Sequence, residues 1–389
     1  NSSPDVGISM GCKTIPYIFV DRQPDLCRIG RELRNEAAIA VDVEADSLFH
    51  YHPKVCLIQI ATPSKNILID PLAIESLSEL IPVFSDPGIC KVFHGADYDI
   101  RSLGRDFGME VNGLFDTQVA AAFLGLKETG LAGVVKERLG VTLDKKYQKK
   151  DWSRRPLPQP MLEYAVKDVL YLLPLADTLR AQLKAGNRLF CVEEECRRLS
   201  RVRAVEGNPH PLFLKFKGAG KLDARSLTVL EAILKFRDEK ARDMDRPPFK
   251  VFGNAQIQKM VREKPRSVNE LLTRGCLSPG QTRVFGHALC RKINQAMHLP
   301  ESVLLTYPRK TGKRLGSKAS DRVKALRKWR EVQAREMGLD PALICSNAQI
   351  RVLAVLNPET SDDLKTVPGI RDWQRALFAR DICDVLHSV

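Results

Sequence analysis

Residues 38–44 read "AIAVDVE", in which β-branched apolar residues alternate with alanine and two acids. Successive side chains of a β-strand point to opposite faces of a sheet, so this pattern predicts a strand with one apolar face. Asp42 and Glu44 project side by side from the other face. Two ionised carboxylates at that spacing repel each other, and a divalent cation between them relieves the repulsion.

The sequence around this strand predicts an α/β domain. Apolar runs at 55–61 and 67–69 indicate two further strands, separated by the turn Thr62–Asn66. Because the connections are short, we expect these three strands to form an antiparallel meander. Residues 91–93 predict another short strand, which leads into a helix near Ala96.

The segment Met161–Ala185 has the apolar periodicity of one long helix, with Pro160 near its start and Gly186 just past its end. Tyr164 and Asp168 are four residues apart, so they are neighbours on one face of that helix. Taken alone, neither this pair nor the two acids on the strand is specific, because exposed helices and strands commonly carry acids.

Further acids follow the strand at 91–93, in the segment "KVFHGADYDIRSL". Asp97 lies where a first helical turn is predicted, and an acid there is ordinarily a cap or a complement to the helix dipole. Asp116, in "FDT" ahead of "QVAAAFLG", is likewise interpreted as a structural acid that starts a helix. His94 is either a core histidine or the partner of an acid.

The joint arrangement of these motifs favours chemistry over structure. An acid pair on a strand, an acid at a strand–helix junction and YxxxD on a late helix are what two-metal phosphodiester hydrolysis requires. Two Mg²⁺ ions about 3.5–4 Å apart stabilise both the attacking and the leaving oxygen. Four carboxylates neutralise such a pair of ions and leave positions open for phosphate and water.

The charge of the chain points to a polyanionic partner. The net charge is +14, and the segment Tyr307–Arg330 holds ten Lys/Arg and one acid. A second basic cluster contains Tyr147 and Trp152, and cations with aromatic residues suit contacts to phosphates and bases. The alternative is that both are ordinary solvated faces. The predicted nucleic-acid-binding residues are Lys145, Lys146, Lys149, Lys150, Trp152, Arg154, Arg155, Arg309, Lys310, Lys313 and Arg314.

The second half of the chain predicts helices only, and it contains an internal repeat. Residues 230–249 and 323–343 are similar, and each copy is followed by a related helix, "NAQIQKM" or "NAQIRVL". Two copies of one helical unit of roughly 80 residues are the simplest interpretation. We therefore expect three domains, at 12–205, 208–300 and 315–389.

Several classes of protein are excluded. No apolar run approaches the ~20 residues that a membrane-spanning helix needs, and the first residues lack the features of a signal peptide. The ten cysteines are scattered without CxxC or Cys/His clusters, so we expect free thiols in a cytoplasmic protein and no zinc site. A helicase is disfavoured because there is no GxxxxGK[ST] loop.

The segments "VDVEADS", "VCLIQIAT", "NILIDPLA", "VFHGADYDI", "GLFDTQVAAAFLG", "GVTLDKKYQKKDWSRRPL" and "YAVKDVLYLLPL" follow one another between Ile15 and Leu183. In this order they resemble ribonuclease D and its nuclear-exosome relatives, which are DEDD exonucleases with a ribonuclease H-like fold. The histidine subtype would have His at position 163, where this chain has Glu163, so the resemblance is to the tyrosine subtype. The catalytic residues that it implies are Asp42, Glu44, Asp99, Tyr164 and Asp168.

The resemblance also implies a role for each of these residues. Asp42 would contact both metal ions, while Glu44 and Asp168 would hold the ion that binds the attacking water. Asp99 would support the second ion, in part through water. Tyr164 would orient the nucleophilic water and help to deprotonate it. The cofactors implied are two divalent metal ions, Mg²⁺ or Mn²⁺.

The expected fold is thus an α/β ribonuclease H-like exonuclease domain, a mixed sheet flanked by helices, followed by two small all-α domains. The latter resemble the helicase-and-RNase-D C-terminal (HRDC) domain. The family implies a monomeric 3′-to-5′ exoribonuclease that acts on RNA with a free 3′ end, such as transfer RNA precursors, and releases nucleoside 5′-monophosphates. Two alternatives remain, a DNA 3′-to-5′ exonuclease and a non-catalytic nucleic-acid-binding protein.

Overall fold

The strand predicted at 38–44 lies inside a six-stranded mixed sheet. The computed structural model describes residues 15–204, 211–308 and 315–389. The strand order is β1-β4-β3-β2-β5-β6, in which β3 and β4 are antiparallel while β2, β5 and β6 are parallel. The strands are β1 (Ile18–Val20), β2 (Ala38–Ala45), β3 (Val55–Ala61), β4 (Asn66–Ile69), β5 (Cys90–Phe93) and β6 (Leu114–Asp116).

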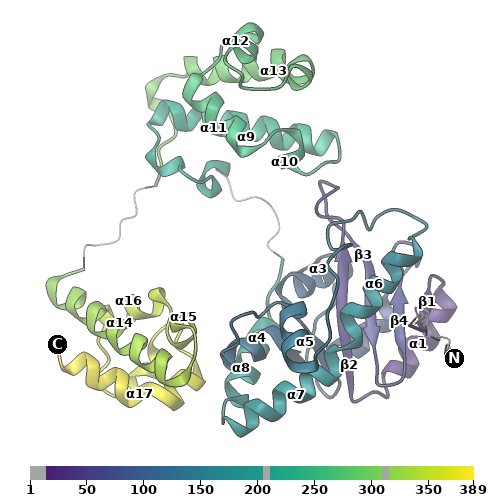
Figure 1. Cartoon of the computed structure of the whole chain (residues 1–389). Helices are drawn as coiled ribbons and strands as arrows, with labels where there is room; N and C mark the ends of the chain where they lie inside the picture. Colours follow the sequence, from purple (N-terminus) through teal and green to yellow (C-terminus); the bar gives the residue numbers. More distant parts are fainter. Residues whose placement is uncertain (1–14, 205–210, 309–314) are drawn as a thin grey trace, which may run out of the picture. The chain divides into compact units, whose positions relative to one another are not determined.

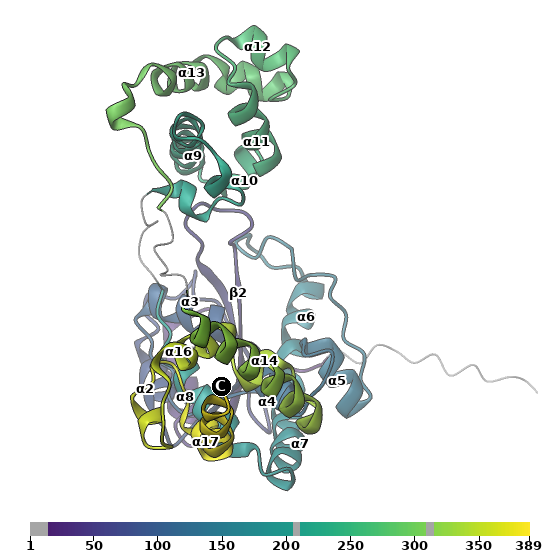
Figure 2. The same ribbon diagram turned by 90° about the vertical axis from the view of Figure 1, so that its left-hand side faces the viewer.

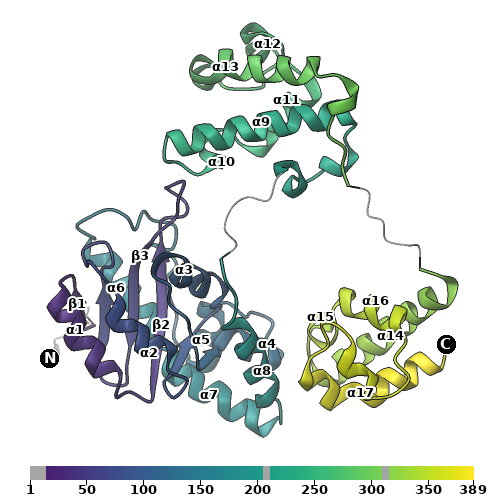
Figure 3. The same ribbon diagram turned by 180° about the vertical axis from the view of Figure 1, so that it is seen from behind.

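Helices cover both faces of this sheet. Ile39, Val41 and Val43 of β2 pack with residues of α1, α2 and α3, whereas Ala40 packs with residues of α4, α5 and α7 on the opposite face. Figure 1 shows α6 and α7 on one side, and Figure 3 shows α2 from behind. The helices are α1 (Gln23–Leu33), α2 (Ile81–Ser85), α3 (Asp97–Phe107), α4 (Thr117–Phe123), α5 (Leu131–Leu139), α6 (Gln159–Leu170), α7 (Leu172–Ala185) and α8 (Leu189–Leu199).

The single long helix predicted at 161–185 is wrong, because the chain forms two helices, α6 and α7. They meet at Tyr171, whose φ of −99° and ψ of −3° depart from helical geometry. Pro174 accounts for the break, since it has no N–H to donate to the carbonyl of Leu170 and its ring crowds that carbonyl. The predicted end is confirmed, with Gly186 as the residue that caps α7.

The predicted repeat is confirmed by matching elements in the two helical domains. In each copy a long helix, α9 or α14, is followed by a four-residue helix, a ten-residue helix, one further short segment and a final long helix. The further short segment is the α-helix α12 in the first copy and a 3-10 helix, Asp363–Thr366, in the second. Figure 2 shows α14, α16 and α17 of the second copy gathered together. The first copy has α9 (Ala224–Asp243), α10 (Pro248–Val251), α11 (Asn254–Glu263), α12 (Val268–Thr273) and α13 (Pro279–His298), and the second has α14 (Ser317–Met337), α15 (Pro341–Ile344), α16 (Asn347–Leu356) and α17 (Asp372–His387).

The two copies also share their internal hydrogen bonds. Arg237 donates to the side-chain oxygen of Asn254 at 2.9 Å, and Arg330 donates to that of Asn347 at 3.0 Å. Each arginine also donates to the backbone carbonyl two residues before that asparagine. Because corresponding partners are 93 residues apart in the sequence, the copies are duplicates of one fold.

The described residues divide into two compact units, of which the second comprises residues 45–54 and 211–308. The first unit contains the sheet, its helices and residues 315–389. In the first unit, the carboxylate of Glu194 on α8 accepts the backbone N–H groups of Asp372 and Trp373 at the start of α17. Arg371 contributes no capping side-chain bond to that helix, so a neighbouring element satisfies these donors. No helix of the described residues is long and apolar enough to cross a membrane.

Candidate active site

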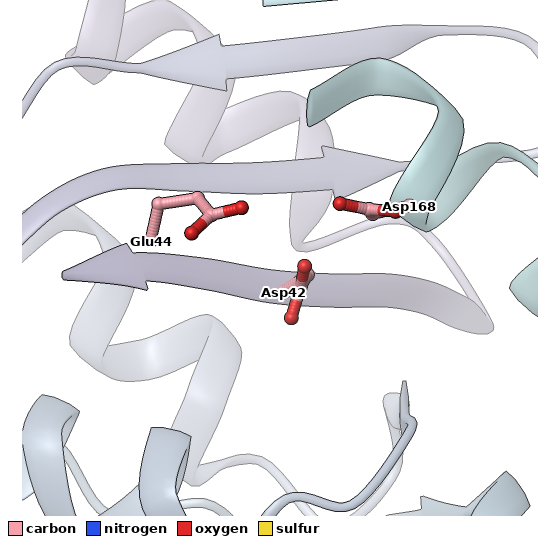
Figure 4. A group of neighbouring side chains, drawn as sticks. All are labelled: Asp42, Glu44 and Asp168. Carbon is pink, nitrogen blue, oxygen red and sulfur yellow. The ribbon is translucent and has the colours of Figure 1, made fainter. Parts of the chain in front are cut away.

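Three of the predicted acids converge at one point of the structure. Asp42 and Glu44 extend from the same face of β2, and α6 places Asp168 opposite them (Figure 4). One carboxylate oxygen from each of the three lies within 4.8 Å of the others. Among the described residues, this is the one group of at least three potential ligands spaced to hold a metal ion.

The electrostatics of this acid trio favour the binding of a cation. Burial raises the pKa of Asp42 to about 7, and burial followed by repulsion from Asp42 raises the pKa of Asp168 to about 8. Burial and the charges of Asp42, Asp168 and Asp99 raise the pKa of Glu44. Carboxylate oxygens are the ligands that Mg²⁺ and Mn²⁺ prefer, and a bound cation would favour the ionised form of each acid. The residues present therefore fit a divalent metal site.

Asp99 lies beside the trio without joining it. Its side chain, on α3, is buried, and burial followed by the charge of Asp42 raises its pKa well above the usual range. Its carboxylate is not one of the three that lie within 4.8 Å of one another. Asp97, two residues earlier, instead forms an ion pair with Arg101 at 2.8 Å, which agrees with the structural role expected for it.

Tyr164 faces the acids from the same helix as Asp168. Its ring is buried next to Trp152 and Tyr147, and its hydroxyl lies close to the carboxylate of Asp168. Burial, followed by the nearby carboxylates, raises the pKa of Tyr164. The phenol is therefore protonated near neutral pH, and it can donate or accept a hydrogen bond at the acids.

A cavity of about 340 Å³ opens over these residues. Its walls include residues that the sequence did not single out, among them Gln118 and Gln148, together with the predicted Lys145. The side-chain amides and the lysine are donors for phosphate and sugar oxygens. The lining residues are Asp42, Val43, Glu44, His94, Gln118, Gly130, Leu131, Ala132, Leu143, Asp144, Lys145, Gln148, Tyr164, Asp168 and Leu172.

The edge of this cavity is held by Asp116, which is structural as predicted. Its carboxylate accepts the backbone N–H groups of Gly95 at 3.0 Å and Ala96 at 2.8 Å, and those of Gln118 and Val119 at the start of α4. Gly95 has a φ of +76°, and a Cβ there would lie 2.8 Å from the side chain of Gln118. A residue with a side chain would therefore strain this corner.

Of the two alternatives for His94, the structure supports the core histidine, which also lines the cavity, and its hydrogen-bond partner is a hydroxyl rather than an acid. Its Nδ1 lies 2.9 Å from the hydroxyl of Thr117, while its buried Nε2 has no hydrogen-bond partner. Burial lowers the pKa of His94, although the charge of Asp116 opposes this. The imidazole therefore lines the cavity as a neutral ring.

The structure divides the basic cluster at 145–155. Lys145 lines the cavity, and Lys146, Lys149 and Lys150 are exposed. The prediction for Trp152 is wrong, because its side chain is fully buried among apolar residues and cannot contact nucleic acid. The remaining predicted residues, Arg309, Lys310, Lys313 and Arg314, lie outside the described residues.

Arg155 serves the fold rather than solvent. Its guanidinium contacts both carboxylate oxygens of Asp70 at 2.5 and 2.6 Å, and it donates to the backbone carbonyls of Cys56 and Trp152. The Asp70 side chain is only 4% exposed. This ion pair therefore attaches the segment that contains Lys145 to the end of β4. All N–H groups of the Arg155 guanidinium donate within the fold, so none is available to bind a ligand.

The raised pKa values predict how the stability of the metal-free protein depends on pH. An unfolded carboxyl has a pKa near 4, so the unfolded chain loses these protons before the folded one does. Each such group contributes stability that is present below pH ~4 and is lost as pH rises through its folded pKa. We expect Asp42→Asn to melt at the wild-type temperature near pH 4 and at least ~3 °C higher at pH 8, since about 1 kcal/mol shifts Tm by roughly 2–4 °C. Thermal melts in EDTA at both values test this, and a difference independent of pH would contradict it.

Comparison with known proteins matches these features. A family model described as "3'-5' exonuclease" matches residues 17–184, and a model of the HRDC domain matches residues 226–293 and 319–386. Ribonuclease D of Escherichia coli is 33% identical over 289 residues, which are 74% of this chain and 77% of that protein. The exosome complex exonuclease RRP6 of Saccharomyces cerevisiae is 34% identical over 64% of this chain and 36% of its own length.

Solved structures of ribonuclease D and RRP6 have the same fold as this chain. The crystal structure of Escherichia coli RNase D, described as an exoribonuclease involved in structured RNA processing, has a TM-score of 0.72 at 28% identity and covers 96% of this chain and 99% of its own. The catalytic core of RRP6 from Trypanosoma brucei has a TM-score of 0.66 at 35% identity over 76% of this chain and 82% of its own. The expected mixed-sheet exonuclease domain and helical C-terminal region are thereby confirmed.

Proposed function

Since this chain belongs to the ribonuclease D family of 3′-to-5′ exoribonucleases, we propose that its acid trio binds divalent metal ions, Mg²⁺ or Mn²⁺, and hydrolyses RNA one nucleotide at a time. The observation that carries this proposal is the convergence of Asp42, Glu44 and Asp168 beneath a cavity lined by hydrogen-bond donors. When bound, two ions would supply an activated water and stabilise the charge on the leaving oxygen. The products are a nucleoside 5′-monophosphate and RNA with a new 3′-hydroxyl.

The chain's own residues divide the remaining work. Asp42, Glu44 and Asp168 hold the ions, and Asp99, whose charge acts on Asp42 and Glu44, supports the second ion. Tyr164 orients the attacking water through its hydroxyl and, as a protonated phenol, can stabilise it without becoming ionised. His94, which is neutral, lines the cavity into which the last nucleotide would enter.

The proposed substrate is RNA with a free 3′ end, with transfer RNA precursors as the first candidate. Lys145 is placed at the cavity, and Lys146, Lys149, Lys150 and Arg154 continue the positive charge along an exposed segment. Lysine and arginine side chains along a single strand displace its counterions, which gives affinity without sequence preference. We propose that the enzyme works as a monomer in the cytoplasm. A reducing compartment is compatible with the free thiols of the described cysteines.

The purified protein with Mg²⁺ is expected to shorten a 5′-labelled RNA in single-nucleotide steps and to release only 5′-monophosphates. A matched RNA that ends in a 3′-phosphate should resist degradation, because the terminal hydroxyl is part of the expected end recognition. A DNA of the same sequence tests the alternative of a DNA exonuclease, which would shorten the DNA as well as or better than the RNA. Binding of both RNAs with no product from either would contradict the proposed hydrolysis and support a non-catalytic RNA-binding protein.

A further inference from the structure

One buried side chain near the acid trio has no partner in the fold. Gln59 is the one uncharged polar residue in the otherwise apolar strand β3, "VCLIQIA", and it is 0% exposed. Neither its amide nitrogen nor its amide oxygen has a hydrogen-bond partner. Among the described residues it is the only buried side chain with two such atoms. An unsatisfied buried polar group costs about 1–3 kcal/mol, so a leucine of similar size would be the more stable choice for packing alone.

The strand pattern places Gln59 on the same face as Asp42. β3 is the neighbour of β2 in the sheet, and Figure 4 shows the two strands running in opposite directions. The isoleucines on either side of Gln59 pack with Val41 and Val43 in the core on the far face. Because side chains alternate along a strand, Gln59 points to the other face, as Asp42 and Glu44 do.

The helix above this face carries the third acid. Gln59 is paired across the sheet with Leu68 of β4, and α6 packs against both β3 and β4. Leu68 lies in one cluster with Tyr164 and Ala165 of α6. Gln59 is therefore enclosed between the strand that carries Asp42 and the helix that carries Asp168.

A second buried glutamine shows what a purely structural amide looks like in this protein. Gln374, which is 3% exposed, donates to the carbonyl of Ile344 at 2.8 Å and accepts from Gln349 and from the backbone of Arg371. Both polar atoms of this side chain therefore form hydrogen bonds within the fold. The amide of Gln59 is equally buried but forms no hydrogen bond.

We propose that Gln59 is a positioning residue of the metal site, whose amide N–H donates to the carboxylate of Asp42 and fixes its orientation when cations bind. This inference rests on the proposed metal site. Carboxylates that ligate a metal are commonly held by an outer hydrogen bond, and removal of such a partner typically weakens metal affinity ~10–100-fold. The unsatisfied amide is then a feature of the metal-free protein, and metal binding supplies its partner.

The test is a calorimetric titration of Mn²⁺ into metal-free protein, without RNA. Gln59→Leu is expected to bind Mn²⁺ ~10–100-fold more weakly than the wild type, while its melting temperature in EDTA stays the same or rises. Gln374→Leu, the matched control, is expected to melt at a lower temperature and to bind Mn²⁺ with wild-type affinity. In RNA hydrolysis, Gln59→Leu should lower kcat at limiting Mg²⁺, leave KM for RNA unchanged and recover at high Mg²⁺.

Each outcome decides between the two roles. Wild-type Mn²⁺ affinity in Gln59→Leu, with or without a lower melting temperature, overturns the proposal and leaves Gln59 as a packing residue. Gln59→Met repeats the measurement if the leucine variant does not fold. Asp42→Asn in the same titration tests the underlying site: if it keeps wild-type affinity, the metal site itself is misplaced, whereas its loss of Mn²⁺ binding beside an unaffected Gln59→Leu refutes only the role of Gln59.

Discussion

Asp42→Asn is expected to lower RNA hydrolysis at least a thousandfold while the protein remains folded and binds RNA. Asparagine has nearly the same shape, so packing on β2 is preserved, but it provides one neutral oxygen where a charged carboxylate faces Glu44 and Asp168. A thousandfold loss corresponds to about 4 kcal/mol of transition-state stabilisation, which is the scale expected when metal ions that stabilise the reacting oxygens are lost. Single-turnover hydrolysis with saturating protein separates this effect from binding.

Asp97→Asn is the matched control for that variant. Asp97 is an exposed acid on α3 that pairs with Arg101, and it is not part of the acid trio. Its loss should change the rate less than about twofold, since exposed ion pairs contribute little. More than ~0.1% residual activity in Asp42→Asn, or an equal loss in Asp97→Asn, would falsify the assignment of the metal site.

Arg155→Ala is expected to destabilise the exonuclease domain by about 3 kcal/mol and to raise KM for RNA as well. The substitution leaves the nearly buried carboxylate of Asp70 without its partner, and breaking a buried ion pair from one side typically costs about 3–5 kcal/mol. The lower part of that range applies because the arginine side chain is 28% exposed. Since the same segment carries Lys145 and Gln148 into the cavity, its release should also raise KM for RNA.

The neighbouring residue provides the control. Arg154 is 79% exposed and pairs with Asp151, so Arg154→Ala should change the free energy of unfolding by less than about 0.5 kcal/mol. Chemical denaturation of Arg155→Ala, Asp70→Ala and the double variant measures the coupling between the two charges. If Arg155→Ala unfolds like Arg154→Ala, the ion pair does not fasten the segment.

The parts of the site that follow from local geometry were predictable from the sequence. Asp42 and Glu44 share a face because strands alternate, and Tyr164 and Asp168 do because helices repeat every 3.6 residues. That these two pairs belong together came from the joint pattern and the family resemblance. Neither the two-residue repeat of a strand nor the 3.6-residue repeat of a helix shows that a strand lies next to a helix about 120 residues later in the sequence.

The parts that depend on contacts between distant segments were not predictable. Trp152 lies among lysines in the sequence, and only packing against β3, β4 and α6 buries it. Arg155 looked like its basic neighbours until Asp70 was placed opposite it. The position of Gln59 near Asp42 depends on how β3 is placed beside β2, which the sequence alone does not show. The break at Tyr171 could have been predicted from the sequence, because Pro174 lies three residues later. The apolar periodicity continues across the break, and it favoured one long helix.

The shared hydrogen bonds of the two helical domains occupy few positions, and duplication left the rest of each surface free to change. The first copy has fifteen lysines and arginines against seven acids between Ala224 and His298, whereas the second has twelve against ten between Ser317 and His387. One ancestral scaffold thus carries a strongly cationic surface in one copy and a nearly balanced one in the other. Since positive charge attracts polyanions, we expect the first copy to contribute more to RNA binding than the second.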